Sequence, residues 1–425
     1  MTSARFADYM KQDLQTFGMP LRLSFPPYPV VGMPVSVLQQ YIEGNDPVTG
    51  KPLMQEVIDA LTKPVTEEEK KGEFRIVSRP RLIKPDTEDN LRRLFLENGW
   101  TDGLPVILPT EERVAEMLKG TSHKPDEVVG EMSITDSEAG LEYTVEKVAA
   151  IAVMAGARPE HLPVILAIAS TNETAFPSST TSFGRMIVVN GPIRKELGMN
   201  SGVGALSPLN MTNSIIGRAW TLMTINFGNT RVGETFLGSQ GNNLNYNNMC
   251  VAENEERSVW DPFHVQKGYK PGESIVSLFR GWSVLNSMGA TNQRPAHEET
   301  VILLKAFCAL LSAATLILDP LVAKNLKEMQ CFDTKEKYSQ WLSENVKIPA
   351  GQYWKADLIY AFVLPLAQQG IEPYATWYKL PDDALITPYN DPRNINIVVV
   401  GGETNALWKT TDFHYTTSAS IDKWR

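Results

Sequence analysis

Apolar residues recur at helical spacing in many stretches of this chain, and short β-branched runs lie between them. Capping residues and terminal glycines predict helices at 54–61, 89–98, 110–119, 145–155, 161–170, 213–227 and 300–318. Runs at 104–108, 185–189 and 395–400 predict strands that are buried on both faces. This alternation predicts an α/β fold with helices packed around a mostly parallel sheet. No internal repeat is visible.

The first 75 residues differ from the rest because they are rich in proline and poor in strand patterns. The charged run 66–71 is typical of a solvated linker, so we expect a domain boundary near residue 75. We therefore predict an N-terminal extension at 1–75, which packs against another subunit or domain, and an α/β catalytic domain at 76–425. A Gly- and Asn-rich loop at 190–264 would carry its site.

Composition excludes several classes of function. The 425 residues carry a net charge of −9, which argues against binding to nucleic acid or to an anionic membrane. The longest apolar stretch, 306–318, is too short to span a bilayer and is expected to be a buried helix. Residues 1–20 lack the apolar core of a secretory signal. Three cysteines without CxxC spacing predict reduced thiols in a cytoplasmic protein.

The loop around Gly202 and Gly204 precedes a predicted helix, so its backbone N–H groups could bind an anionic group of a substrate. Asn190 lies in a tight turn before this loop, and Asn213 is a candidate cap of the helix. Arg218, near the start of the helix, could clamp a carboxylate. The alternatives are a glycine-rich packing corner for the loop and a structural ion pair for the arginine.

Cys250 is followed by several carboxylates and then by His264. A thiol becomes nucleophilic when a base or cation lies beside it, and His264 could be that group. Glu253 could transfer protons, and Glu253 or Glu255 could bind a hard metal ion. The alternatives are a buried structural cysteine and a solvated acidic face. The sequence requires no cofactor; a divalent metal stays possible, although no histidine pair has the spacing of a zinc site.

Several motifs resemble the UGSC-type (seleno)protein family, which is similar in character to selenoprotein B of the glycine and betaine reductases. They are NGWTDGLP at 98–105, TVEKV at 144–148, NGPI at 190–193, NSGVG at 200–204, IGRA at 216–219, CVAENE at 250–255 and WDP at 260–262. The resemblance covers most of residues 90–402. It implies a site that includes Cys250, Glu253 and Asn254, and its first motif adds Asp102 as a candidate substrate-binding residue.

The chain departs from that family at its name-giving motif. The redox sequence, selenocysteine or cysteine followed by Gly-Ser-Cys, is absent, and no cysteine precedes Cys250. We therefore expect a second subunit that carries the missing N-terminal α/β segment; a self-sufficient homo-oligomer is the alternative.

Two classes of function follow. The chain is expected to be an enzyme subunit, a lyase or an oxidoreductase, that cleaves or forms a carbon–heteroatom bond in a small carboxylate-bearing molecule. Cys250, Glu253 and His264 would be catalytic, and Asn190, Gly202, Gly204, Asn213, Arg218, Asn254, Glu255 and Asp102 would bind the substrate. A lyase or hydratase that depends on a metal or on Glu253 is the second chemistry. A non-catalytic subunit that completes a redox-active partner is the other class.

Overall fold

The computed structural model describes residues 2–16, 21–30, 33–71, 81–132, 141–177, 179–289 and 294–425. The chain forms two compact units. Unit 1 consists of Met1–Asp86 with Val232–Thr235, and unit 2 consists of Thr87–Arg231 with Phe236–Arg425. The boundary predicted near residue 75 lies at 72–80, outside the described residues.

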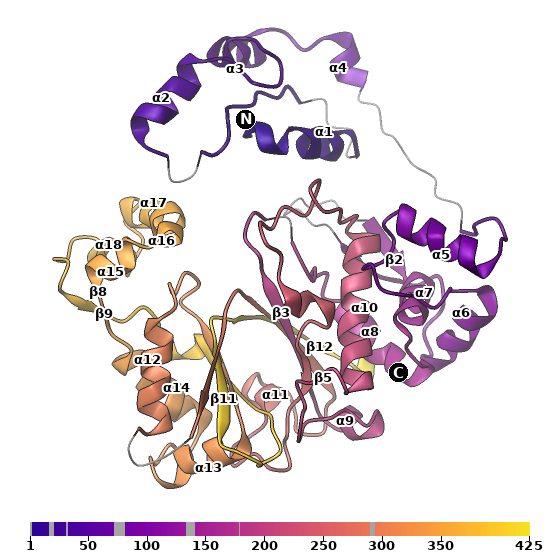
Figure 1. Ribbon diagram of the computed structural model, residues 1–425, viewed down its shortest axis with the longest axis vertical. Coiled ribbons are helices and arrows are strands. Elements are labelled where there is room, and N and C mark those ends of the chain that lie inside the picture. The colour runs from indigo at the N-terminus through magenta and orange to yellow at the C-terminus, as the bar shows by residue number, and fades with distance from the viewer. Residues whose placement is uncertain are drawn as a thin grey trace. The chain divides into compact units, whose positions relative to one another are not determined.

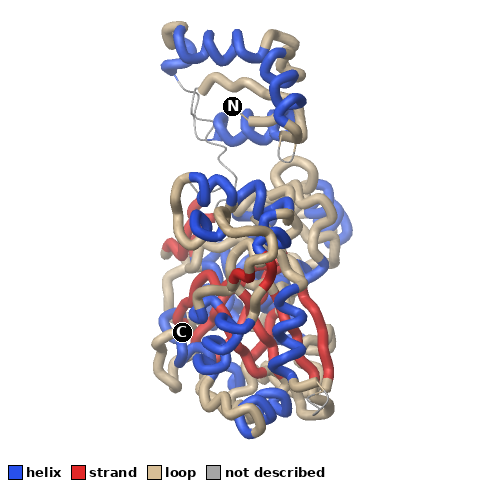
Figure 2. Tube along the Cα trace, turned by 90° about the vertical axis from the view of Figure 1, so that its left-hand side faces the viewer, coloured by secondary structure: helices blue, strands red, loops and turns tan. Residues whose placement is uncertain are grey.

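Unit 1 contains helices and loops in its described part, whereas the strands lie in unit 2 (Figure 2). Its helices are η1 (Ala4–Phe6), α1 (Ala7–Thr16), α2 (Val35–Glu43), α3 (Leu53–Thr62) and α4 (Glu67–Lys71). The charged run predicted to be a linker therefore forms a short helix. Few side chains are buried here, among them Phe25 and Leu53.

Two polar side chains hold the loops of unit 1 together. The buried carboxylate of Asp46 accepts hydrogen bonds from the backbone N–H groups of Phe25, Val48 and Thr49. Arg22 donates to both carboxylate oxygens of Glu69, and this contact lowers the pKa of Glu69 to about 2. Because the apolar core of unit 1 is small, such local polar contacts are needed to hold its loops in place.

Unit 2 contains the other helices and all strands of the described chain. Its helices are α5 (Glu88–Glu97), α6 (Glu111–Met117), α7 (Val145–Ala155), α8 (Leu162–Ala169), α9 (Ile193–Glu196), α10 (Met211–Phe227), α11 (Phe263–Gln266), α12 (Ala296–Lys305), α13 (Pro320–Glu328), α14 (Lys335–Asn345), α15 (Ala350–Trp354), α16 (Asp357–Phe362), α17 (Leu364–Gln368) and α18 (Tyr374–Trp377). Capping confirms the predicted starts of α6 and α7, since Thr110 and Thr144 accept hydrogen bonds from the first turns. Helix α5 begins one residue before its predicted start and is capped by Thr87.

The strands are β1 (Val128–Met132), β2 (Leu141–Thr144), β3 (Gly184–Asn190), β4 (Cys250–Ala252), β5 (Ile275–Gly281), β6 (Val284–Met288), β7 (Ala314–Leu318), β8 (Ile348–Pro349), β9 (Leu385–Ile386), β10 (Ile395–Val399), β11 (Leu407–Thr411) and β12 (His414–Ser420). Two sheets have four strands, in the orders β12-β5-β3-β4 and β10-β7-β11-β6. The pairs β1-β2 and β8-β9 form two small sheets.

The α/β class is confirmed, but the prediction of a mostly parallel sheet is wrong. Among the described strands, β3 with β4 and β7 with β10 are parallel pairs, and the other pairings are antiparallel. The β-branched runs of β3 and β10 are buried as expected. These strands are buried because a second sheet, rather than a second layer of helices, covers one of their faces. A strand covered in this way has the same continuous apolar run as a strand between two helix layers.

The two four-stranded sheets form the inner layers of a four-layer α-β-β-α arrangement (Figure 1). Val188 and Phe279 of one sheet pack against Ile317 and Val398 of the other. Helices α8 and α10 cover the outer face of the first sheet, with α7 packed against them, and α12, α13 and α14 cover that of the second. The main core therefore lies in three apolar layers between these four, and a smaller cluster that includes Tyr353 and Trp377 lies among β8, β9 and α15–α18.

The topology repeats. In each half of the unit, a strand runs through helices to a parallel neighbour and then to an antiparallel one: β3, β4 and β5 first, and β7, β10 and β11 second. The fourth strands are exchanged, since β6 pairs with β11 and β12 pairs with β5. The expectation of no internal repeat is thus corrected at the level of topology.

The segment that leads from β5 to β6 and the segment that leads from β11 to β12 cross at one point. There the Asp412 carboxylate accepts hydrogen bonds from the N–H groups of Trp282 (2.8 Å) and Ser283 (2.9 Å). A Cβ atom on Gly281 would lie 2.3 Å from the Phe413 ring, so only glycine fits. This close approach holds the halves together.

Two further elements were predicted wrongly. Residues 104–108 form no strand, and the helix predicted at 300–318 is α12 followed by the strand β7. Between these two elements, Ala309 and Ser312 have φ angles of 53° and 47°, which no α-helix contains. An apolar run suits a buried strand as well as a buried helix, so its periodicity cannot decide between them. Among the described residues, no helix is long and apolar enough to cross a membrane.

Candidate functional site

The carboxyl ends of β3, β4 and β10 meet where the two large sheets adjoin. The N–H of Asn254, just after β4, donates to the carbonyl of Val399 in β10 over 2.7 Å. The Asn254 side chain donates to the carbonyl of Gly401 over 2.8 Å. Open α/β sheets bind ligands outside the carboxyl ends of their parallel strands, so this junction is the first place to seek a site. Asn254, a predicted substrate-binding residue, is engaged in the junction itself.

Glu253 lies at the centre of this junction and is fully buried. Its carboxylate accepts hydrogen bonds from the Asn190 side chain (2.7 Å) and from the backbone N–H groups of Phe263 (2.6 Å) and Val399 (3.2 Å). Burial alone would raise the pKa of Glu253. The charge and hydrogen bond of Lys335, together with these donors, outweigh burial and leave the pKa below its ordinary value. Glu253 is therefore ionised at neutral pH.

Lys335 is the counter-ion of Glu253. Its Nζ lies 2.8 Å from Oε1 of Glu253, and its side chain is 1% exposed. Lys335 is the first residue of α14, whose N-cap is Thr334. The positive end of a helix dipole disfavours a cation there, and a buried ion pair seldom stabilises more than apolar residues would. Helix stability therefore does not explain this lysine.

Glu255 and Arg194 form a second layer behind Glu253. Glu255 accepts hydrogen bonds from the Asn190 side chain (2.9 Å) and from the N–H of Gly191 (2.8 Å). Arg194, on α9, lies 2.8 Å from Glu255 and donates to the carbonyl of Glu253 over 2.7 Å. It also donates to Glu256, and this contact is the main cause that lowers the pKa of Glu256 to about 2.

His264 is fully buried beside this layer, and neither of its ring nitrogens has a hydrogen-bond partner among the described residues. Its Nδ1 lies 4.0 Å from Oε1 of Glu255. The side-chain oxygen of Asn190 is also buried without a partner in the described structure. Buried polar atoms are rarely left unpaired in native proteins, so His264 and Asn190 stand out in this layer.

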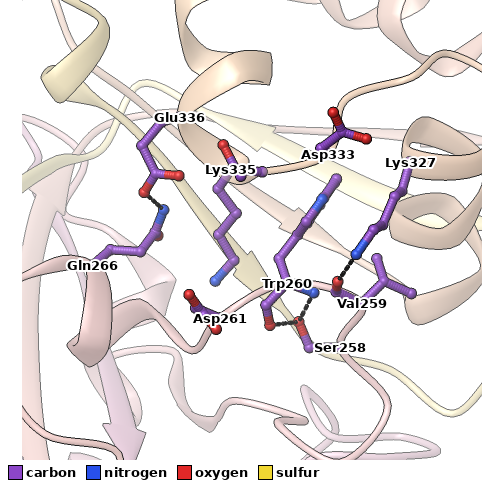
Figure 3. Close-up of a pocket in the computed structure, with 10 residues that line it drawn as sticks. Ser258, Val259, Trp260, Asp261, Gln266, Lys327, Asp333, Lys335 and Glu336 are labelled. Carbon is purple, nitrogen blue, oxygen red and sulfur yellow. Dashed lines mark hydrogen bonds between the residues drawn. The ribbon is translucent and has the colours of Figure 1, made fainter.

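Lys335 also lines a polar cavity of about 340 Å³ (Figure 3). Its lining comes from the segment after β4 and from α13 and the start of α14: Ser258, Val259, Trp260, Asp261, Gln266, Lys327, Asp333, Thr334, Lys335 and Glu336. Lys327 donates to the carbonyl of Val259 over 2.6 Å, and Gln266 donates to Glu336. The size falls in the range of pockets that hold small molecules, and two lysines face three carboxylates in it.

The glycine loop of Gly202 and Gly204 is a packing corner in this structure. The Gly202 N–H donates to the Asn200 side chain over 2.9 Å, and a Cβ atom on Gly402 would lie 2.2 Å from Val203. Asn213, a predicted substrate-binding residue, is buried and exchanges hydrogen bonds with the Asn200 backbone. Of the two interpretations of the loop, its contacts favour packing.

Arg218 and Asp102 lie together, but they satisfy each other. The Arg218 guanidinium donates to both oxygens of Asp102, over 2.7 and 2.9 Å, and to the carbonyl of Pro105 over 2.9 Å. The Asp102 side chain is 5% exposed. This is the structural ion pair left open as an alternative, and it leaves Arg218 little capacity to clamp a substrate.

Cys250 lies in β4 with its side chain in the apolar core, 3% exposed. Burial raises the pKa of its thiol well above the ordinary value, so the thiolate is scarcely formed at neutral pH. His264 and Glu253 could not activate it through a contact, since no hydrogen bond joins either of them to the thiol in the described structure. This geometry supports the buried structural cysteine rather than the nucleophile.

Sequence reasoning missed Lys335, Lys327 and Arg194. Lys335 lies in a stretch that resembles any capped surface helix, Thr-Lys-Glu-Lys, and nothing local shows that it is buried. The motif 190–193 identified the turn at Asn190, but it ends one residue before Arg194.

No group of three His, Cys, Asp or Glu side chains in the described chain could hold a metal ion.

Comparison with known proteins produced no match. No protein-family model, no curated protein and no solved structure is significantly similar to this chain. The resemblance drawn from motifs therefore stays a prediction.

Proposed function

We propose that this chain is an enzyme, or a subunit of one, that binds a small polar, carboxylate-bearing molecule in the cavity beside Lys335. It would cleave or form a carbon–heteroatom bond in that molecule. The observation that carries the proposal is the buried Lys335–Glu253 pair, whose lysine lines a polar cavity. Perturbed, buried ion pairs that border a cavity are characteristic of functional sites.

The charges of the cavity suit a small carboxylic acid. Lys335, Lys327 and the N-terminus of α14 supply positive potential that would attract the carboxylate. Asp261, Asp333 and Glu336 supply acceptors for an amino or hydroxyl group. This combination selects polar molecules with groups of both kinds.

The pair also supports a division of chemical roles. In the direction of cleavage, the electron pair of the broken bond leaves with the heteroatom, and the ammonium of Lys335 would supply the proton that it needs. Glu253, held ionised, would stabilise the ammonium before the transfer. Asp261 on the same cavity wall would accept the proton from the neighbouring carbon of the substrate, and the electron pair of that C–H bond would form the double bond between the two carbons. This scheme assigns the chemistry to a lyase and uses no thiol.

Substrate consumption tests the proposal. Pools of small amino and hydroxy acids would be incubated with the full-length protein, and NMR would detect those that are consumed. We expect turnover with the wild type and loss of at least about 100-fold in Lys335→Met, because proton transfer typically contributes that factor or more. The exposed Lys347, two residues beyond the end of α14, gives the control Lys347→Met, which should keep full activity. Full activity in a folded Lys335→Met variant would contradict the proposal.

The apolar surface of unit 1 favours the proposal of a second subunit as well. Val35 on α2 and Leu61 on α3 are 73% and 82% exposed. Copurification of a smaller protein with this chain, lost when Val35 and Leu61 are changed to Ser, would support a partner. A monodisperse and fully active single chain would oppose it.

A further inference from the structure

A row of basic side chains crosses the first large sheet at the end opposite to the junction of β4 and β10. Arg185 of β3 pairs in register with Arg280 of β5, and Arg280 pairs with His414 of β12. Residues that pair directly across antiparallel strands point to the same face of the sheet. The three side chains therefore lie side by side on one face, and none of them belongs to the cavity beside Lys335.

Four buried nitrogen atoms in this region have no hydrogen-bond partner among the described residues. They are Nη1 of Arg185, Nε of Arg280, Nε1 of Trp282 and Nδ1 of His414. Arg185 still has an ion pair, because its Nη1 lies 3.3 Å from the Glu173 carboxylate. Native proteins pair nearly all such buried atoms, so the three that lack any partner, on Arg280, Trp282 and His414, require a common explanation.

Two carboxylates lie beside the row, and both are already engaged. Arg185 pairs with Glu173, and the backbone N–H groups of Trp282 and Ser283 donate to Asp412. Arg280 forms no ion pair within the described chain, and its guanidinium lies 5.8 Å from the centre of the Phe183 ring. Burial first, and then the charges of Arg280 and Lys267, lower the pKa of His414, while Glu173 opposes them. Arg280, whose Nε atom is buried, is therefore the arginine of the row that has no anionic partner within the described chain.

We propose that Arg280, with Trp282 and His414, forms a binding site for a small oxyanion: phosphate, sulfate, or the carboxylate of a larger molecule. The guanidinium would bind two oxygens of the anion, as arginine does with planar and tetrahedral oxyanions. The indole N–H of Trp282 and the imidazole of His414 would donate to the others. Arg185 would add positive charge from the neighbouring strand, and the Phe183 ring would hold the guanidinium flat.

Calorimetric titration of the full-length protein with inorganic phosphate, sulfate and acetate, each separately, tests this site. We expect at least one of the three to bind, and Arg280→Gln to weaken that binding by about tenfold or more, because a charge-assisted contact is lost. The matched control is Arg294→Gln, which removes a 64% exposed surface arginine paired with Glu299 and should leave affinity unchanged. Binding of phosphate alone, of sulfate alone or of acetate alone would identify the preferred form.

A second measurement keeps the test decisive if Arg280→Gln fails to fold. A bound anion stabilises the imidazolium form, so the pKa of His414 in the wild type should rise when the anion is added, which NMR titration of the imidazole resonances measures. His414→Gln should weaken binding and remove the shifted resonance. The proposal is overturned if none of the three anions binds, if Arg280→Gln binds as tightly as the wild type, or if the His414 resonance does not respond. Turnover of a substrate in the cavity is a separate readout, so its absence would leave this site untouched.

Discussion

The ammonium of Lys335 lies 2.8 Å from the carboxylate of Glu253, and neither side chain is more than 1% exposed. This contact joins the start of α14 to the end of β4, and through Val399 it also reaches β10. A buried pair of this kind ties three elements from both halves of the unit to one carboxylate. Its contribution to stability and its proposed contribution to chemistry can be separated by mutation.

Glu253→Gln should lower the free energy of unfolding by about 3–5 kcal/mol, because it leaves the Lys335 ammonium buried without a counter-ion. Urea denaturation measures this. The double variant Glu253→Gln with Lys335→Met should recover part of the loss, since no unpaired charge then remains. Glu344→Gln, exposed on the same helix as Lys335, is the control and should change stability by less than about 0.5 kcal/mol. An effect of Glu253→Gln no larger than that of the control would show that the pair is not buried as described.

The same carboxylate predicts a pH dependence of stability. The pKa of Glu253 is lower in the folded protein than its ordinary value of 4.5. The folded state thus gains stability from the ionised form, fully present above pH about 4.5 and lost as pH falls through the lower, folded-state pKa. The difference in unfolding free energy between the wild type and Glu253→Gln should therefore shrink as pH falls below about 4.5. A difference that stays constant down to pH about 2.5 would contradict the assignment.

Lys327→Met should weaken capture of any carboxylate-bearing substrate by about tenfold, because it removes one of two cations from the cavity wall. Lys324, exposed on the same helix and outside the cavity, provides the control Lys324→Met. The KM of the substrate found by NMR measures the effect. Equal rises of KM in both variants would point to general surface charge rather than to the cavity.

Cys250→Ala should keep full turnover and lose about 1 kcal/mol of stability, because the thiol fills space in a packed core. An aromatic disulfide reagent should modify the exposed Cys331 in the native protein and reach Cys250 only after unfolding. Cys331→Ser identifies the fast-reacting thiol. If a folded Cys250→Ala variant lost its turnover, the thiol would return to the mechanism in place of Lys335.

The sequence predicted well those parts of the fold that depend on interactions between residues close together in the chain. Thr144 caps α7 and Gly156 ends it with a φ of 86°, as the pattern indicated. The exchange of β6 and β12 could not be predicted in this way, because it depends on pairings between residues more than 100 positions apart. The repeat is invisible in the sequence because its halves share strand directions rather than residues.

The candidate site shows the same difference between features set by neighbouring residues and features set by distant parts of the chain. The tight turn at Asn190 and the acidic segment after Cys250 led to Glu253, Glu255 and His264, which the structure does bring together. Lys335 was missed because its burial depends on β4 and β10, distant parts of the chain. Arg218 and Gly202 were candidates for ligand contacts, with a structural ion pair and a packing corner as the alternatives, and each already has an internal partner. A side chain with a free donor and one already engaged look alike in a sequence.

The exchange of the fourth strands has a consequence for any attempt to divide the protein. A fragment that ended between β6 and β7 would present β5 with one flank unpaired, because β12 would be missing, and its own β6 would have no neighbour. Exposed strand flanks of that kind recruit other chains and aggregate. Each half thus supplies the strand that completes the sheet of the other half. Truncation anywhere between residues 290 and 406 should therefore yield inclusion bodies rather than a smaller working protein.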